Sequence, residues 1–196
     1  MNAAVFFDMD GTIAEPNIDW QDLRLKLGIP PGETIMDHIV SLPAGERERT
    51  EAALKQIEYE AAESSTPTAG IVELVKGLRA RQIKVALITN NHREAMHCVV
   101  DRIGLEFDLT LSREDATLKP APDLLLMALR ELQVSPQEVR FVGDGKYDRL
   151  ACAAATIEYI HLSHEFNKPV DGPAGPAADG GKTISGLDEL WDYLGL

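Results

Sequence analysis

Basic residues, cysteines and long apolar runs are all scarce in this 196-residue chain. The two cysteines, Cys98 and Cys152, lie far apart and fit neither a metal knuckle nor a redox pair, so we expect buried, reduced thiols. Apolar runs reach only about six residues, against the roughly 20 that span a bilayer, which excludes a transmembrane helix. Asp8 and Asp10 interrupt the N-terminal apolar stretch, which argues against a secretory leader and makes the cytoplasm the expected location.

The excess of acidic residues bears on the kind of partner the chain can have. The 32 Asp and Glu against 19 Lys and Arg give a net charge of −13, which repels nucleic acids and anionic lipids. We therefore expect neither a nucleic-acid nor a membrane partner, and we attribute most of the charge to solubility. The 44% apolar and 26% charged content is that of an ordinary globular chain, and the length fits one domain with a modest insertion.

Short apolar runs alternate with amphipathic stretches along most of the chain. Each run is followed by a turn or helix signal, as is typical of strands buried on both faces of a parallel sheet. The expected strands cover 3–7, 85–88, 109–111, 139–142 and 159–162. Apolar residues at helical spacing predict helices over 71–78, 96–103 and 125–132, with Gly104 ending the second. The alternation predicts an α/β fold, a Rossmann-like, doubly wound parallel sheet.

One stretch near the N-terminus breaks the alternation. Between about 15 and 67 no strand pattern is present, and the apolar spacing is helical. Three helices are expected there, around 20–27, 35–42 and 54–61. Pro16 opens the stretch and Ser64–Pro67 closes it with linker chemistry. We therefore expect a small all-helical cap hinged on the sheet domain, with the cap at 16–66 and the core at 1–15 and 67–196.

The C-terminal part is expected to differ again. Residues 163–182 are rich in glycine and proline, which predicts a loop. Apolar spacing over 187–194 then predicts a last helix.

Two acidic residues follow the first expected strand directly, in the run Asp8-Met9-Asp10-Gly11-Thr12. Because the carboxyl ends of parallel strands line the ligand crevice of an open sheet, we expect these carboxylates in that crevice. Two carboxylates so close repel one another unless a cation or a proton intervenes. Gly11 permits a tight turn after them. The alternative is an acidic turn after an edge strand.

A second pair of acids follows the expected strand at 139–142. Asp144 again lies at the carboxyl end of a strand, and Asp148 lies one helical turn further on. Carboxylate oxygens of this kind suit Mg²⁺, which takes a few carboxylates and keeps several waters. For Asp148 the alternative is an early-helix acid that interacts with the helix dipole.

Further polar residues follow two other strands. Thr89 and Asn90 stand where a strand leads into a helix, and a hydroxyl beside free N–H groups makes an anion site, although Thr89 could instead be the helix N-cap. Lys119 precedes Pro120-Ala121-Pro122, whose prolines fix the backbone and indicate a placed charge. Three more residues near this edge are expected to be solvated: His92, Arg93 and Arg113.

Acids, a hydroxyl, an amide-rich turn and one ammonium at one sheet edge supply what phosphoryl transfer needs. In order and separation these segments resemble the four motifs of the haloacid dehalogenase superfamily, over about residues 4–162. The motif residues are Asp8, Asp10, Gly11 and Thr12, then Thr89 and Asn90, then Lys119, then Gly143, Asp144 and Asp148. The expected cap lies where this superfamily places its C1 cap. The run Lys119-Pro120-Ala121-Pro122-Asp123 further resembles the phosphoglycolate phosphatase and β-phosphoglucomutase branch.

The resemblance implies a role for each motif residue. Asp8 would be the nucleophile that forms an aspartyl-phosphate, and Asp10 would protonate the leaving alcohol and then activate water. The Mg²⁺ ligands would be Asp8, the backbone carbonyl of Asp10, Asp144 and Asp148. The residues at the phosphate would be Thr89, Asn90 and Lys119, the last offsetting negative charge.

The function implied by the resemblance is a Mg²⁺-dependent phosphatase acting on a small phosphorylated metabolite, with phosphoglycolate suggested by analogy. The acid at position 10 favours phosphate-ester chemistry, because the true dehalogenases and the phosphonatases lack it. A phosphomutase and a nucleotide or flavin-nucleotide phosphatase share the same motifs and stay open, as does a catalytically inactive binding scaffold. Both a monomer and a homodimer are compatible with the sequence.

Overall fold

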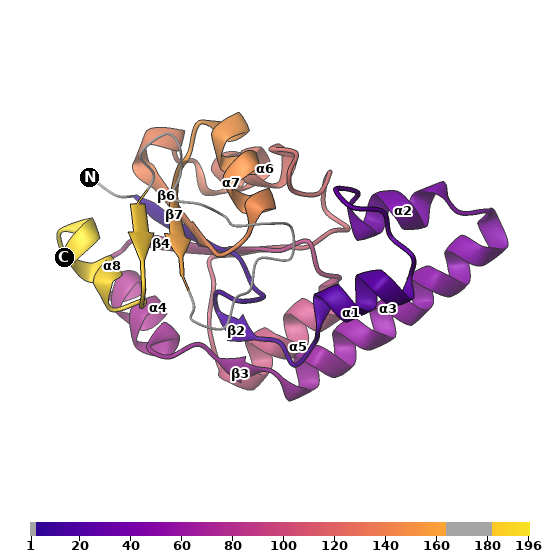
Figure 1. Ribbon diagram of the computed structural model, residues 1–196. Helices are drawn as coiled ribbons and strands as arrows, with labels where there is room; N and C mark the ends of the chain where they lie inside the picture. Colours follow the sequence, from indigo (N-terminus) through magenta and orange to yellow (C-terminus); the bar gives the residue numbers. More distant parts are fainter. Residues whose placement is uncertain (1–2, 164–181) are drawn as a thin grey trace.

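A six-stranded parallel sheet forms the centre of the computed structural model, which describes residues 3–163 and 182–196 (Figure 1). The strand order is β5-β4-β1-β6-β7-β8, and every neighbouring pair is parallel. The strands are β1 (Ala4–Phe7), β4 (Lys84–Ile88), β5 (Leu109–Leu111), β6 (Val139–Gly143), β7 (Glu158–Leu162) and β8 (Lys182–Ile184). The chain runs outward from β1 in both directions, which confirms the expected doubly wound α/β fold.

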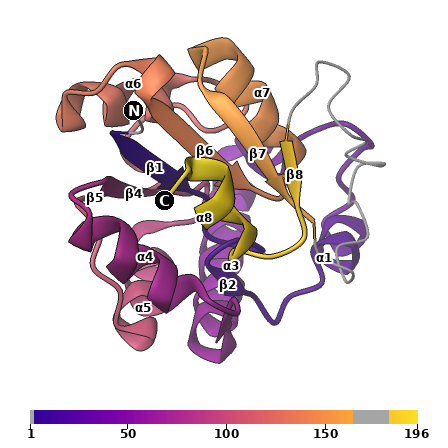
Figure 2. The same ribbon diagram turned by 90° about the vertical axis from the view of Figure 1, so that its left-hand side faces the viewer.

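Helices cover both faces of the sheet (Figure 2). One face carries α4 (Ile71–Ala80), α5 (Arg93–Ile103) and α8 (Glu189–Leu194), and the other carries α6 (Asp123–Leu132) and α7 (Lys146–Ala155). A short 3₁₀ turn, η1 (Pro136–Glu138), precedes β6. Strand β1 is buried on both faces: Val5 and Phe7 pack toward α4 and α5, and Phe6 packs toward α6. This double burial explains why its sequence is continuously apolar.

The helices of the sheet domain lie within about three residues of their expected bounds. In α4 the apolar stripe of Ile71, Leu74, Val75 and Leu78 is buried against the sheet. Helix α5 ends at Gly104, whose φ of 68° is the left-handed conformation that favours glycine at a helix C-terminus.

Residues between β1 and α4 form a separate helical layer at the carboxyl ends of the strands (Figure 1). It contains α1 (Trp20–Lys26), α2 (Ile35–Ser41) and α3 (Ala44–Ser64). The first two match the apolar spacing, whereas α3 begins well before the expected 54–61, because its first turns are exposed and show no apolar stripe. Three buried residues, Leu23, Ile39 and Leu54, form the centre of its own small core. Helix α3 also packs along α5 of the sheet domain.

The expectation that no strand lies between residues 15 and 67 is wrong at the two ends of this insertion. Strand β2 (Ala14–Glu15) pairs antiparallel with β3 (Thr66–Pro67). The two connecting segments leave the sheet domain side by side, so their backbones pair. Two residues on each side are too few to produce a recognisable period-2 pattern.

The C-terminal part contains one strand that the sequence did not predict. Strand β8 begins at Lys182, within the stretch expected to be a loop, and pairs with β7. Three residues again give too little pattern for prediction. Residues 164–181 of the expected loop lie outside the described residues, whereas the last helix is confirmed as α8. Across the described part of the chain, no helix combines the length and apolarity that crossing a membrane requires.

Candidate active site

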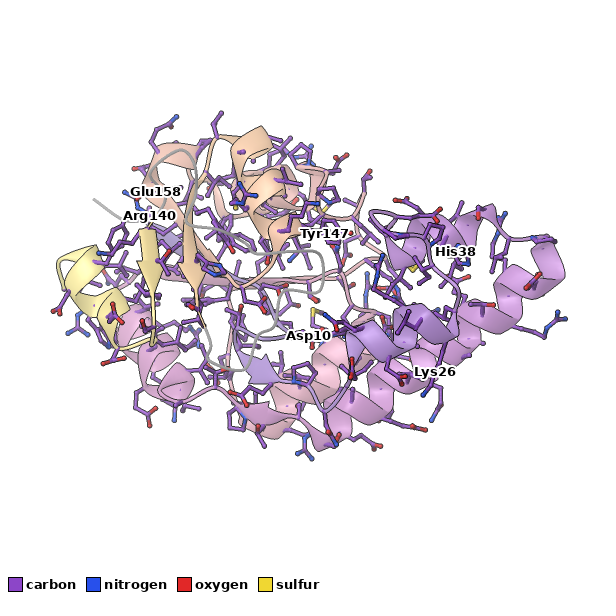
Figure 3. All side chains as sticks on the ribbon, in the orientation of Figure 1. Asp10, Lys26, His38, Arg140, Tyr147 and Glu158 are labelled. Carbon is purple, nitrogen blue, oxygen red and sulfur yellow. The ribbon has the colours of Figure 1, made fainter. Side chains whose placement is uncertain are left out.

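A pocket of about 1040 Å³ lies at the carboxyl ends of β1, β4 and β6. Its lining comes from both sides: acids and amides from the sheet domain, and apolar residues such as Trp20 and Met36 from the insertion. Asp10 lies between the two, whereas Lys26 and Arg140 lie well away from it (Figure 3). The chain reverses its direction of winding at β1, which is where open α/β sheets form their ligand crevice.

The turn after β1 holds the first two acids in place. The N–H of Gly11 donates to the carbonyl of Ala14 at 2.8 Å, and the N–H of Ala14 donates to the carbonyl of Met9 at 3.1 Å. Gly11 has a φ of +75°, and a Cβ there would collide with the carboxylate of Asp144. Glycine is therefore required at this position for two reasons, the left-handed backbone and the close approach of an acid from β6.

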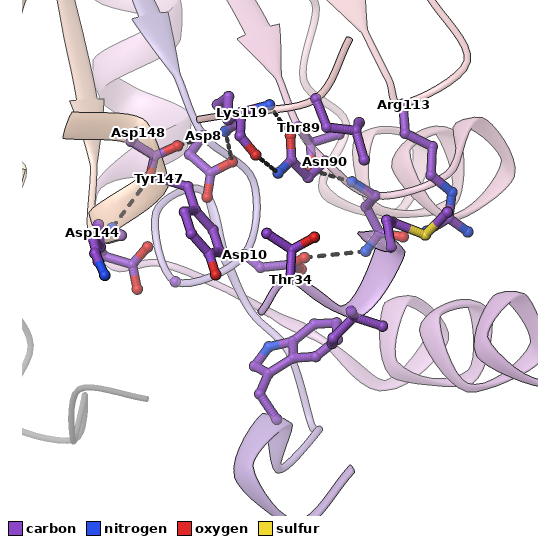
Figure 4. A pocket seen from close by; sticks show the side chains of 18 of the residues that line it. Asp8, Asp10, Thr34, Thr89, Asn90, Arg113, Lys119, Asp144, Tyr147 and Asp148 are labelled. Atoms are coloured by element: carbon purple, nitrogen blue, oxygen red, sulfur yellow. Dashed lines mark hydrogen bonds and ion pairs between the residues drawn. The ribbon is translucent and has the colours of Figure 1, made fainter. Parts of the chain in front are cut away.

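Three carboxylates, two from strand ends and one from the first turn of α7, meet in one group. Oxygens of Asp8, Asp144 and Asp148 all lie within 4.8 Å of one another. A Cβ on Gly143 would lie 2.7 Å from Oδ2 of Asp148, so glycine is needed there as well. Four pocket residues that follow β1 and β6 or begin α7 are seen together in the close view of Figure 4: Asp8, Asp144, Tyr147 and Asp148.

Lys119 is the buried cation of this group. Its Nζ donates to Oδ1 of Asp8 at 2.6 Å, lies 2.6 Å from Oδ1 of Asp148, and donates to the carbonyl of Ile88 at 2.8 Å. Only 3% of its side chain is exposed. All three ammonium protons therefore have an acceptor, and the expectation of a placed charge is met.

The pKa values show that the group is short of positive charge. Burial and the neighbouring Asp148 together raise the pKa of Asp8 to about 6, although Lys119 opposes the shift. Burial and the neighbouring Asp8 raise the pKa of Asp10 to about 7. The pKa of Asp144 is raised well above its usual value by burial and by Asp8. Burial by itself would lower the pKa of Lys119, but Asp148 and Asp8 outweigh it and raise that pKa. One ammonium among four acids leaves room for a dication with oxygen ligands.

The loop after β4 holds Lys119 from the other side. Oδ1 of Asn90 accepts from the N–H of Lys119 at 2.9 Å, and Nδ2 of Asn90 donates to the carbonyl of Lys119 at 2.7 Å (Figure 4). Thr89 is buried, and its Oγ1 accepts from the N–H of Asn91 at 3.0 Å. Helix α5 begins only at Arg93, so the alternative that Thr89 is the helix N-cap is wrong.

Asp148 lies both in the acidic group and in the first turn of α7. Oδ2 accepts from the N–H of Gly145 at 3.1 Å, at the start of α7, while Oδ1 faces Lys119. One carboxylate thus helps to begin the helix and belongs to the acidic group.

The sequence of the chain is similar to those of known hydrolases. A sequence profile of haloacid dehalogenase-like hydrolases matches residues 3–156. The chain belongs to this family. A haloacid dehalogenase-like hydrolase domain-containing protein of Arabidopsis thaliana is 31% identical over 175 residues, which cover 84% of this chain and 71% of the relative. Phosphoglycolate phosphatase 1 of Pseudomonas aeruginosa is 27% identical over 218 residues, covering 97% of this chain and 78% of the relative.

Solved structures agree on the fold of this haloacid dehalogenase-like hydrolase. A predicted phosphoglycolate phosphatase from Haemophilus somnus superposes with a TM-score of 0.76 at 15% identity, covering 98% of both chains. A hydrolase from Pseudomonas syringae superposes with a TM-score of 0.78 at 19% identity, covering 99% of this chain and 98% of the other.

Two residues expected on the solvated surface are buried at the junction with the insertion. The side chains of His92 and Arg113 are only 3% and 6% exposed, and both contact Glu58 of α3, which is also buried. Arg93 is half exposed and pairs with Asp115, so the surface interpretation is confirmed for that residue alone. The carboxylate that contacts His92 and Arg113 comes from a helix far away in sequence. No local pattern could therefore have shown that these two side chains are buried.

Proposed function

We propose that the chain is a Mg²⁺-dependent phosphatase that hydrolyses a small phosphate monoester through an aspartyl-phosphate on Asp8. The observation that carries this proposal is the environment of Asp8, which lies beside two further carboxylates and contacts the buried ammonium of Lys119. Relatives named phosphoglycolate phosphatases make phosphoglycolate the first substrate to test.

The residues present fit a magnesium ion. Asp8, Asp144 and Asp148 would supply carboxylate oxygens and Asp10 its backbone carbonyl, and the surplus of negative charge in the group favours a bound dication. When bound, Mg²⁺ would neutralise phosphate oxygens and so open the acidic pocket to an anionic substrate.

Asp8 and Asp10 divide the chemistry. A carboxylate oxygen of Asp8 attacks phosphorus and forms a new O–P bond, while the bond to the leaving oxygen breaks and that oxygen takes the proton of Asp10. Asp10, now ionised, takes a proton from water, and the water oxygen displaces Asp8 from phosphorus, which releases phosphate. The order of their pKa values suits these roles: Asp8, at about 6, is ionised at neutral pH, while Asp10, at about 7, is partly protonated.

Three residues are proposed to hold the phosphoryl group. Lys119 would offset the charge of Asp8 and the transferred phosphate. Thr89 and Asn90 stand at the end of β4 beside them, and Asn90 keeps Lys119 in place through both ends of its amide. With its amide so engaged, Asn90 would contribute to the phosphate site mainly by holding that lysine.

We propose residues 16–66 as a cap that contacts the leaving group. The pocket is lined on this side by Ile18, Trp20, Met36 and Leu54. Its volume of about 1040 Å³ slightly exceeds the roughly 300–1,000 Å³ of pockets that enclose drug-sized ligands. That size favours a second candidate, a nucleotide or flavin-nucleotide phosphatase, over a substrate as small as phosphoglycolate.

A substrate panel tests both candidates. Phosphate release would be measured with Mg²⁺ for phosphoglycolate, sugar phosphates, nucleoside monophosphates and a flavin mononucleotide. We expect hydrolysis that needs Mg²⁺, with kcat/KM ranking the substrates. Turnover that depends on a sugar bisphosphate activator would identify a phosphomutase instead. No Mg²⁺-dependent hydrolysis of any member would refute the proposed function.

A further inference from the structure

A continuous set of hydrogen bonds connects Asp10 to the insertion. Nδ2 of Asn91 donates to Oδ2 of Asp10 at 3.1 Å. Oδ1 of Asn91 accepts from the N–H of His92 at 2.8 Å and lies 3.2 Å from the Nδ1 of the same residue. That Nδ1 lies 3.0 Å from Oε2 of Glu58. Asn91, His92 and Glu58 are each no more than 5% exposed, so water does not compete for these contacts.

Arg113 fixes Glu58, the residue of this hydrogen-bonded set that is farthest from Asp10. Its two terminal nitrogens donate to both carboxylate oxygens of Glu58, at 2.9 and 2.8 Å. Its backbone N–H donates to the carbonyl of Asn91 at 3.1 Å. A bidentate pair of this kind fixes direction as well as distance. Glu58 belongs to α3, which runs along α5 (Figure 1), so one carboxylate of the insertion holds two side chains of the sheet domain.

The contacts allow only one orientation of the Asn91 amide. A backbone N–H can only donate, so the atom facing the N–H of His92 is the oxygen, and the NH₂ group must face Asp10. The N–H of Asn91 is held in turn by Thr89. Asp10 therefore receives a fixed donor on Oδ2, which leaves its other oxygen to carry the proton.

We propose that Asn91 is a positioning residue for Asp10, and that Glu58 makes this positioning depend on how α3 packs against the sheet domain. The inference rests on the proposed function. A carboxyl group that is held on one oxygen presents the proton on the other in a defined direction, toward the leaving oxygen of the substrate. Without Asn91 the carboxyl of Asp10 can rotate, and proton donation becomes inefficient while the nucleophile and the metal ligands stay in place.

This role predicts a specific dependence on the leaving group. A weakly basic leaving group such as 4-nitrophenolate departs with little help from an acid, whereas an alkoxide needs the proton as the bond to phosphorus breaks. Loss of Asp10 positioning should therefore reduce the hydrolysis of alkyl phosphates far more than that of 4-nitrophenyl phosphate. A variant that only destabilises the folded site would reduce the hydrolysis of alkyl phosphates and of 4-nitrophenyl phosphate by the same factor.

The test compares kcat/KM with Mg²⁺ for 4-nitrophenyl phosphate, phenyl phosphate and an alkyl phosphate. For Asn91→Ala we expect a decrease of about 10-fold or less on the first and about 100-fold or more on the last, the scale of general acid catalysis. Glu58→Gln should show the same trend more weakly, because its amide pairs less strongly with Arg113. Arg93→Ala, next to this set but half exposed, is the matched control and should change no substrate by more than about twofold.

A double-mutant cycle keeps the test decisive if Asn91→Ala is partly unfolded. Asp10→Asn removes the acid itself and should give the steepest dependence on the leaving group. Adding Asn91→Ala to that variant should then make the dependence no steeper. Equal losses on every substrate, or a further steepening in the double variant, would overturn the positioning role while the phosphatase activity of the wild type stands. A wild type without phosphatase activity would overturn the proposed function itself.

Discussion

Replacing Lys119 with Met gives a quantitative test of the charge balance at the site. The substitution keeps an unbranched apolar stem that ends near the position of the lysine Cε, and it removes the ammonium that lies 2.6 Å from both Asp8 and Asp148. Removing one partner of a buried ion pair typically costs about 3–5 kcal/mol, because the other partner stays buried and uncompensated. We expect a loss of about that size in the free energy of unfolding of the metal-free protein at pH 8.

The loss should depend on pH in a defined direction. Without Lys119 the pKa of the Asp8 carboxyl rises further above its wild-type value of about 6. A carboxyl whose pKa is raised by folding destabilises the protein above that pKa, and the cost fades as the pH falls through it. The destabilisation by Lys119→Met should therefore be largest near pH 8 and smaller near pH 5, where Asp8 is protonated and no longer needs the cation.

Urea unfolding followed by circular dichroism, in the presence of a chelator at pH 8 and pH 5, measures both quantities. Lys26→Met is the matched control, because Lys26 forms an exposed pair with Asp22 on the outside of α1 and should give no measurable change. Mg²⁺ should restore part of the stability of Lys119→Met at pH 8. An equal loss at both pH values would show that Lys119 is held by packing alone, and the argument from charge would be wrong.

Three further outcomes can be checked with the same protein. Removal of divalent cations should abolish phosphate release, Mg²⁺ should restore it and Ca²⁺ should restore it poorly, because Ca²⁺ prefers more ligands and looser geometry; full activity in excess chelator would contradict this. Gly11→Ala should weaken Mg²⁺ binding at least about tenfold, a cost of about 1.4 kcal/mol, because the added Cβ collides with Asp144 and the φ of residue 11 is +75°. Calorimetry measures this affinity, and an unchanged value would show that the turn does not require glycine at this position. Trp20→Ala should raise KM for large substrates more than for 4-nitrophenyl phosphate, because Trp20 lines the pocket from the insertion; equal changes would mean that Trp20 only packs inside the insertion.

Much of the sheet domain and its acids could be predicted because the signals are local. A continuous apolar run followed by an acid marks the carboxyl end of a buried strand, and that end of every parallel strand faces the same crevice. Asp8 and Asp144 could therefore be placed together although they lie far apart in the sequence. The two carboxylates lie close together because β1 pairs with β6, and each acid follows the end of one of these strands.

The junction between the sheet domain and the insertion could not be predicted because its signals are not local. His92 and Arg113 look like solvated surface side chains until α3 brings Glu58 between them. The pairing of β2 with β3 depends on two segments that converge only after the insertion has folded. Asn91 is inconspicuous in the sequence, and only its amide contacts with Asp10 and His92 distinguish it.

Direct observation of a phosphorylated Asp8 tests the central claim. The protein would be mixed with Mg²⁺ and 4-nitrophenyl phosphate, quenched in acid within milliseconds, digested and mapped by mass spectrometry. The account predicts one phosphoryl group on the peptide that contains Asp8, which forms and decays at rates compatible with turnover, and none in Asp8→Asn, whose amide is not an anionic nucleophile. Rapid turnover with no phosphorylated peptide, or undiminished turnover by Asp8→Asn, would contradict it.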